Sequence, residues 1–277
     1  MIAFATIPKP FAGHIDTIQR NAIVSWLHVA PDVKVTLLGD DPGVAEAAVS
    51  LGVDHVADLA RNSYGTPLLD RAFAVAVERA GGRPVCFVNT DILLPPSFAR
   101  AAETVARRAG SFLVVGECRN ARIETSLTAG SLDWEALGRG ARKRGADAID
   151  YFLFSEGVFT DIPAFAVGRT AWDNWLVWKA RDEDALVVDA TSVVRAIHQD
   201  HDYGHVGSLA KVRVSPEADE NRRLAGGGRA HLYSRYDATY RLTRFGLVPN
   251  PLAIAHAGET VRRGIAKLGY KTGLRQS

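Results

Sequence analysis

The chain has 277 residues, of which 47% are hydrophobic, and its 33 Lys and Arg residues nearly balance its 31 Asp and Glu residues to give a formal net charge of +2. This length and composition suit one large α/β domain, or one domain with a small appendage, and the weak net charge argues against generic binding to nucleic acid. No apolar stretch approaches the roughly 18 residues that a membrane span needs, and no secretory leader is recognisable, so we expect a cytoplasmic protein.

The first half of the chain alternates short β-prone runs with segments whose apolar residues recur at helical spacing. Strands are expected at residues 2–7, 33–39, 53–57, 84–88 and 112–116, and helices at residues 15–29, 43–51, 67–80 and 95–109. This alternation predicts a parallel sheet that binds ligands at the carboxyl ends of its strands. Cys86 and Cys118 lie inside apolar runs, and we expect both as buried free thiols.

The second half of the chain is less regular. Helices are expected at residues 132–144 and 170–178, an aromatic run lies at residues 151–159, and strands are expected at residues 185–188 and 193–197. A basic amphipathic helix is expected over residues 252–268, followed by a basic tail. Two interpretations of this helix stay open: a solvated basic face, or peripheral contact with anionic lipid at the inner face of a membrane.

Asn89-Thr90-Asp91 follows the apolar run 84–88, at the edge where a parallel sheet binds ligands. Side chains two positions apart in an extended segment point the same way, so Asn89 and Asp91 are expected to face one site. A carboxylate there suits a divalent cation, which can neutralise the diphosphate of a sugar nucleotide. The alternative is an Asx turn that links the strand to the next helix.

Three of the eight histidines, His198, His201 and His205, fall within eight positions and are interleaved with Asp200 and Asp202. Imidazoles and carboxylates at this density are typical of a site wall or a set of metal ligands. The alternative is a hydrogen-bonded polar turn. A structural zinc site would lack its cysteines here, and the H-E-x-x-H pattern of zinc proteases is missing from the sequence.

The sequence Trp172-Asp173-Asn174-Trp175 places a carboxylate between two large aromatic side chains, which suit the faces of a sugar. Desolvation between these rings would raise the basicity of Asp173, which is therefore the predicted general base. The alternative is that the tryptophans form a buried stripe at helical spacing and leave Asp173 exposed.

Glycine-rich dinucleotide, P-loop and nucleophile-elbow motifs are missing from the sequence, which weakens dehydrogenase, kinase and hydrolase interpretations. The motifs that remain come in this order along the chain: Thr6-Ile7-Pro8-Lys9-Pro10 after the first strand, Gly39-Asp40-Asp41 after the second, the polar run from Arg61 to Thr66, and Asn89-Thr90-Asp91 after the fourth. This order resembles that of the GT-A glycosyltransferases.

The resemblance implies an α/β fold with a mostly parallel sheet flanked by helices and a less regular C-terminal extension. It implies a catalytic domain over residues 1–205, with a nucleotide-binding half at 1–120 and an acceptor half at 121–205, and an extension over residues 206–277. The donor-binding residues implied by the resemblance are Thr6, Ile7, Pro8, Asp40, Arg61, Thr66, Asn89 and Thr90. Arg119 and Arg122, with Arg61, are further candidates for pairing with phosphate oxygens.

The resemblance further implies that Asp91 binds Mn²⁺ or Mg²⁺ and that His201 or His205 completes the metal shell. Asn89 stands where the family has the first aspartate of its Asp-x-Asp motif. Asp173 lies where inverting members carry an acidic residue beneath the acceptor, which implies direct displacement with inversion.

The implied function is transfer of a sugar from a nucleoside-diphosphate sugar to a hydroxyl of a glycan, a lipid-linked acceptor or a small molecule, in polysaccharide or glycoconjugate synthesis. Two alternatives stay open. A nucleotidyltransferase that makes sugar nucleotides would carry a basic, glycine-rich first loop, of which Lys9 and Gly13 are the only traces here. A non-catalytic binding protein could keep the fold after losing the first metal carboxylate. The sequence does not determine the oligomeric state.

Overall fold

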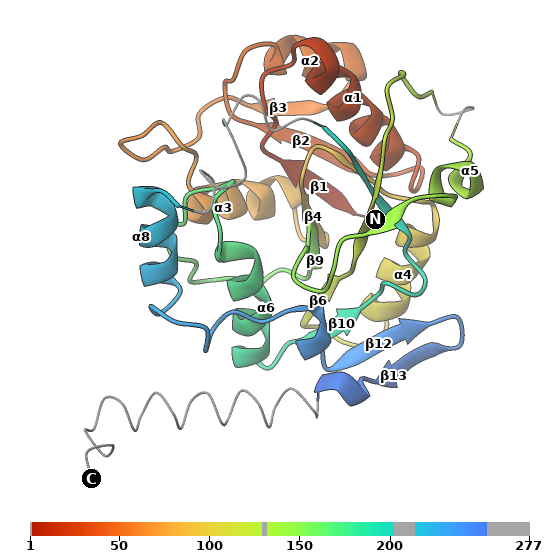
Figure 1. The fold of residues 1–277 in the computed structure, drawn as a ribbon, viewed down its shortest axis with the longest axis vertical. Coiled ribbons are helices and arrows are strands. Elements are labelled where there is room, and N and C mark those ends of the chain that lie inside the picture. The colour runs from red at the N-terminus through yellow and green to blue at the C-terminus, as the bar shows by residue number, and fades with distance from the viewer. Residues whose placement is uncertain (1, 129–131, 202–213, 254–277) are drawn as a thin grey trace.

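The computed structural model describes residues 2–128, 132–201 and 214–253 (Figure 1). Its central sheet has nine strands in these residues, in the order β13-β12-β10-β6-β9-β4-β1-β2-β3. The strands are β1 (Ala3–Thr6), β2 (Lys34–Leu38), β3 (Asp54–Val56), β4 (Val85–Val88), β6 (Phe112–Val115), β9 (Tyr151–Phe154), β10 (Leu186–Asp189), β12 (Tyr240–Thr243) and β13 (Gly246–Pro249). Neighbours pair in parallel, except that β9 is antiparallel to β4 and β6 and β13 is antiparallel to β12. The predicted mostly parallel sheet is confirmed.

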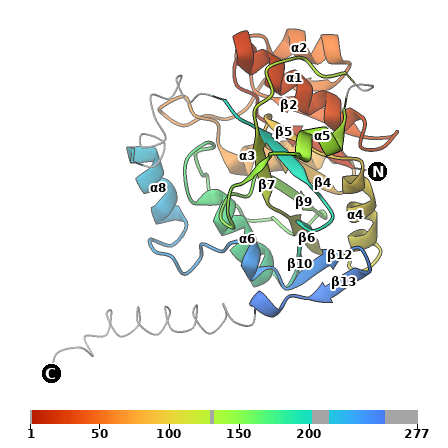
Figure 2. The ribbon, with the colours of Figure 1, turned by 45° about the vertical axis from the view of Figure 1, so that its right-hand side comes forward.

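Helices cover both faces of this sheet because its strands are apolar on both sides. The helices are α1 (Gly13–Leu27), α2 (Val44–Leu51) and α4 (Ser97–Ala106) on one face, and α3 (Leu69–Ala80) and α6 (Trp172–Asp182) on the other (Figures 1 and 2). Successive strand residues point to opposite faces. Phe4 thus stacks on Trp26 of α1 at a ring distance of 5.7 Å, whereas Ala5 packs with the α3 side. Cys86 and Cys118 are buried free thiols, as predicted.

A second, four-stranded sheet brings the later histidines to the edge of the main sheet. Its order is β5-β11-β7-β8, with β5 at Ile92–Leu93, β7 at Cys118–Ala121, β8 at Arg142–Lys143 and β11 at Ala196–Gln199. In the pairing of β11 with β5, His198 lies opposite Ile92. Because Ile92 follows Asp91 directly, this register carries His198 to the aspartate, although the two are far apart in the sequence.

The helix predicted at residues 132–144 is much shorter in the structure, where α5 spans Trp134–Gly138. Asp133 caps its first turn by accepting hydrogen bonds from the amides of Glu135 and Ala136. Gly140 then adopts a φ of 80°, a left-handed conformation that ends the helical path, and β8 follows.

The described part of the C-terminal extension packs against the same sheet. It contains α8 (Pro216–Leu224), a 3₁₀ turn at Arg235–Asp237, and the hairpin of β12 and β13, in which β12 pairs with β10. The Arg235 guanidinium contacts two buried carboxylates of the core, Asp189 at 3.0 Å and Glu117 at 3.2 Å. The predicted basic helix lies outside the described residues from position 254 onward, as does the tail. Among the described helices, none combines the length and apolar character that crossing a bilayer requires.

Candidate active site

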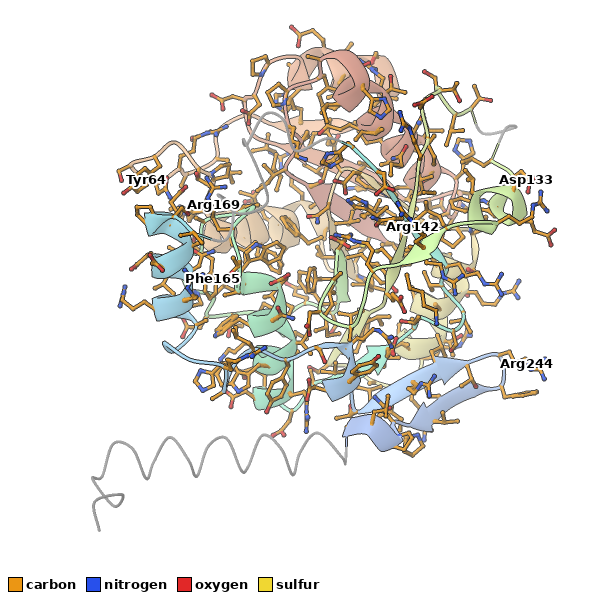
Figure 3. All side chains as sticks on the ribbon, viewed as in Figure 1. Tyr64, Asp133, Arg142, Phe165, Arg169 and Arg244 are labelled. Atoms are coloured by element: carbon orange, nitrogen blue, oxygen red, sulfur yellow. The ribbon has the colours of Figure 1, made fainter. Side chains whose placement is uncertain are left out.

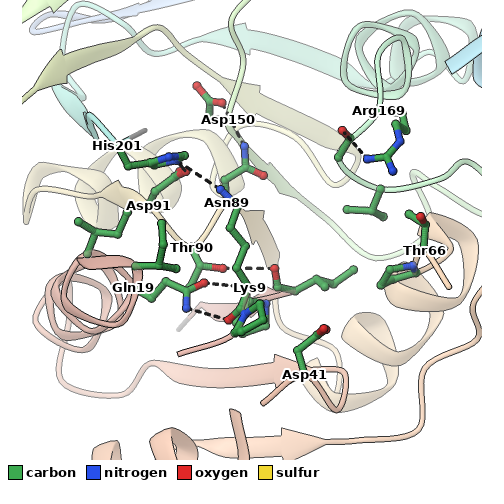
Figure 4. Close-up of a pocket in the computed structure, with 18 of the residues that line it drawn as sticks. Lys9, Gln19, Asp41, Thr66, Asn89, Thr90, Asp91, Asp150, Arg169 and His201 are labelled. Carbon is green, nitrogen blue, oxygen red and sulfur yellow. Dashed lines mark hydrogen bonds and ion pairs between the residues drawn. The ribbon is translucent and has the colours of Figure 1, made fainter. Parts of the chain in front are cut away.

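A cavity of about 460 Å³ opens at the edge of the sheet where β1, β2 and β4 end (Figure 4). The loops that follow these parallel strands gather at this edge because the strands end together there. The antiparallel β9 begins at the same edge. The cavity is lined by residues that the sequence predicted for donor, metal or catalytic roles: Ile7, Pro8, Arg61, Thr66, Asn89, Thr90, Asp91, Asp173, His198 and His201.

Two predicted donor-binding residues do not line this cavity. Thr6 is fully buried behind its wall, where its hydroxyl lies 2.7 Å from that of Thr90 and so fixes the Asn-Thr-Asp turn. The Asp40 side chain is 68% exposed and pairs with Arg61 at 2.7 Å. Its neighbour Asp41 lines the cavity instead and contacts the same guanidinium nitrogen at 2.9 Å.

The Asp91, His198 and His201 side chains form a candidate metal centre, because each offers one ligand atom and these atoms lie within 4.8 Å of one another. His201 Nε2 lies 3.1 Å and His198 Nε2 lies 3.7 Å from Asp91 Oδ2. Asp91 Oδ1 and His198 Nδ1 are buried without a hydrogen-bond partner among the described residues. A divalent cation bound by carboxylate and imidazole would satisfy such atoms, so the residues fit Mn²⁺ or Mg²⁺. His205 lies outside the described residues.

The charges around Asp91 favour its ionised form. Burial alone would raise the pKa of Asp91, but His198, the hydrogen bond from His201 and Lys9 together hold that pKa below its ordinary value. Burial also lowers the pKa of His198, against the opposing effect of Asp91. Metal binding requires an ionised carboxylate and neutral imidazoles, and both of these pKa shifts are in that direction.

Asn89 faces Asp150, the residue that precedes β9. The Asn89 side-chain nitrogen donates to Asp150 Oδ1 at 3.1 Å, and Arg144 forms an ion pair with Asp150 Oδ2. Burial raises the pKa of Asp150, whereas Arg144 and His198 oppose that rise. Asp150 and Arg144 could not be recognised from the sequence, because neither belongs to a motif and the pairing of β4 with β9 brings Asp150 to the site.

Asp173 stands at the first turn of α6 and lines the cavity. Burial raises the pKa of Asp173 to about 7, and the negative charges of Asp150 and Asp147 add to the rise, against a 2.9 Å hydrogen bond from the Asn174 amide. The predicted increase in basicity is therefore found. The predicted alternative is also partly correct, since Trp172 and Trp175 are 5% exposed and pack in the core.

Two other polar residues of the wall, Gln19 and Arg169, belong to no recognisable sequence motif. Gln19 of α1 clamps the first loop, accepting from the Lys9 amide at 2.7 Å and donating to the Lys9 carbonyl at 2.9 Å. Arg169 is held beside α8 by Glu217, at 2.6 Å (Figure 3). Of the other predicted phosphate-pairing arginines, neither Arg119 nor Arg122 lines the cavity, and the Arg122 side chain is 81% exposed.

No protein-family model matches the chain, and no curated protein matches it. Solved structures do. Glucosyl-3-phosphoglycerate synthase from Mycobacterium tuberculosis in complex with phosphoglyceric acid has a TM-score of 0.50 at 15% identity, over 82% of this chain and 80% of the synthase chain. The same synthase with Mg²⁺ and uridine diphosphate has a TM-score of 0.49 at 14% identity, over 82% and 79% of the two chains. At this identity the likeness concerns the fold, and it identifies the sheet and its helices as a GT-A fold.

Proposed function

We propose that this chain is a glycosyltransferase that moves a sugar from a nucleoside-diphosphate sugar to a hydroxyl of a small-molecule acceptor. The observation that carries the proposal is one cavity that holds both a candidate metal centre with unsatisfied ligand atoms and, on α6, a carboxyl group whose pKa lies near neutrality. Transfer of a sugar from a diphosphate needs both groups, one for the leaving group and one for the attacking hydroxyl.

The donor end of the cavity is the wall formed by the first loop and the metal centre. Asp91, His198 and His201 would hold the divalent cation, which supplies positive charge to the departing diphosphate. Lys9, whose ammonium lies 3.3 Å from His201 Nε2, adds a cation to the same wall. Ile7 and Pro8 give this wall an apolar surface on which a nucleotide base can pack.

The acceptor end of the cavity is the wall formed by the first turn of α6. Asp173 would accept the proton of the acceptor hydroxyl as the oxygen attacks the anomeric carbon, while the bond from that carbon to the diphosphate breaks on the opposite face. The sugar configuration is then inverted. A carboxylate with a pKa near the working pH suits this role, because it is both ionised in a useful fraction and basic.

A small anionic acceptor is supported by two arginines of the cavity wall, Arg144 and Arg169, each of which already forms an ion pair, with Asp150 and Glu217 respectively. The synthase with the similar fold was solved with phosphoglyceric acid. Arginine side chains recognise carboxylate and phosphate groups through paired hydrogen bonds. Transfer to larger glycans or lipid-linked acceptors would need contacts beyond these residues.

The decisive experiment is incubation with Mn²⁺ and a panel of UDP-, GDP- and TDP-sugars, each with 3-phosphoglycerate as the first acceptor tried. Acceptor-dependent release of nucleoside diphosphate is the expected result. Release or exchange of pyrophosphate with a sugar phosphate and a nucleoside triphosphate would instead establish a nucleotidyltransferase. Selective thermal stabilisation by a nucleotide without any turnover across the panel would establish a binding protein.

A further inference from the structure

The Asn-Thr-Asp turn carries an amide where a second metal carboxylate is expected, and the structure shows what stands behind that amide. The ladder of β4 and β9 ends with Val88 opposite Tyr151, and it continues by one hydrogen bond, from the Asn89 amide to the Asp150 carbonyl at 3.0 Å. The two side chains also meet, since Asn89 Nδ2 donates to Asp150 Oδ1 at 3.1 Å (Figure 4).

This contact fixes the orientation of the Asn89 carboxamide. With Nδ2 bound to Asp150, the carboxamide oxygen is turned away from Asp150, and no described residue donates a hydrogen bond to it. Without an acceptor at position 150, the amide could rotate and present its electropositive NH₂ group to the cavity instead. That group would repel a cation, whereas the oxygen is a metal ligand or an acceptor for metal-bound water.

The carboxylate of Asp150 is itself held in place. Its side chain is 10% exposed, and its second oxygen forms the ion pair with Arg144, so it has little freedom to turn. An aspartate at position 89 would put two carboxylates in contact at the site of the present hydrogen bond, and such a pair resists double ionisation. Asn89 and Asp150 are therefore a matched pair that carries one negative charge.

We propose that Asp150 is a positioning residue for the metal centre, which acts by holding Asn89 with its carboxamide oxygen toward the cavity. The negative charge that an aspartate would carry at position 89 is instead carried by Asp150, which is hydrogen-bonded to Asn89. Partners of this kind behind a metal ligand typically change metal affinity by about 10- to 100-fold when removed. The inference rests on the proposed metal-dependent transferase.

The test measures the affinity for Mn²⁺ alone, from the free ion signal in electron paramagnetic resonance, so that it needs no turnover. Asp150→Asn keeps one acceptor oxygen for two donors; with that oxygen bound by Arg144, its NH₂ group faces Asn89 and cannot accept, so Mn²⁺ binding should weaken by at least about tenfold. The charge swap, Asn89→Asp with Asp150→Asn, should restore the affinity to within about threefold of the unchanged protein, because it exchanges the amide and the carboxylate and keeps the total charge. If Asp150→Asn alone does not fold, the Mn²⁺ affinity of the charge swap, compared with that of the unchanged protein, decides whether the proposal holds.

The matched control is Asp189→Asn, which removes another aspartate that is buried and bound to an arginine, Arg235, outside the cavity lining. Its stability should fall while its Mn²⁺ affinity stays unchanged. Two results would overturn the positioning role alone. One is wild-type Mn²⁺ affinity in Asp150→Asn, and the other is a charge swap whose Mn²⁺ affinity is no higher than that of Asp150→Asn. Failure of the unchanged protein to bind Mn²⁺, with or without UDP, would instead remove the metal centre and the proposed function with it.

Discussion

Replacing Asp173 by Asn should stabilise the protein while removing its activity, and the stabilisation should depend on pH. Burial raises the pKa of Asp173 from an ordinary value of 3.8 to about 7, so the folded protein pays free energy to ionise this group. Because the folded state keeps the proton to a higher pH than the unfolded chain does, this group lowers stability as the pH rises from about 4 to about 7. Asparagine cannot ionise and escapes that penalty.

The size of the effect follows from the shift of about three pKa units, which corresponds to about 4 kcal/mol at neutral or higher pH. This is an upper limit, because solvent in the cavity screens the charge. The negative charges of Asp150 and Asp147 add to the penalty, whereas asparagine can keep the hydrogen bond from the Asn174 amide. We expect Asp173→Asn to melt roughly 5–10 °C higher than wild type at a pH of about 8 and little higher at about 5.

The assay is thermal unfolding of both proteins across this pH range, with steady-state kinetics alongside. Turnover should fall by about 10²- to 10⁴-fold with donor affinity retained, as expected for loss of a general base. The control is Asp182→Asn, which removes an exposed carboxylate at the other end of the same helix, outside the cavity lining. A melting difference for Asp173→Asn that is the same at both pH values would exclude the burial penalty, and activity near that of wild type would exclude Asp173 as the general base.

Three further outcomes are expected. Asp91→Ala should abolish turnover and the Mn²⁺-dependent part of nucleotide binding, both measurable by calorimetry with and without the metal, and full activity in this variant would remove the metal centre. Gly116→Ala should destabilise the fold by about 1–3 kcal/mol in denaturant unfolding, because the new Cβ would lie 2.1 Å from the hydroxyl of buried Tyr151. Arg235→Ala should cost about 3–5 kcal/mol by the same measurement, since it leaves two buried carboxylates without their cation, and a loss below about 1 kcal/mol would contradict that account.

The fold class and most of the strands could be predicted from local sequence patterns. Apolar runs such as Val85–Val88 read as buried parallel strands because every side chain in them is hydrophobic, and this property is local. The turn at Asn89 was also recognisable locally, because a polar triplet that follows a buried parallel strand lies at the edge of the sheet. The roles assigned to Asp91 and Asp173 at this edge stay predictions until the variants are measured.

Which distant residues meet at this edge became visible in the folded chain. The antiparallel β9 places Asp150 against Asn89, and the small second sheet brings His198 to Asp91; both contacts depend on which strands pair although they lie far apart in the sequence. The pKa of Asp173 likewise depends on burial by segments remote in the chain. Local chemistry sets which elements form, but long-range pairing sets which of their side chains share a site, because contact free energies act through space and not along the sequence.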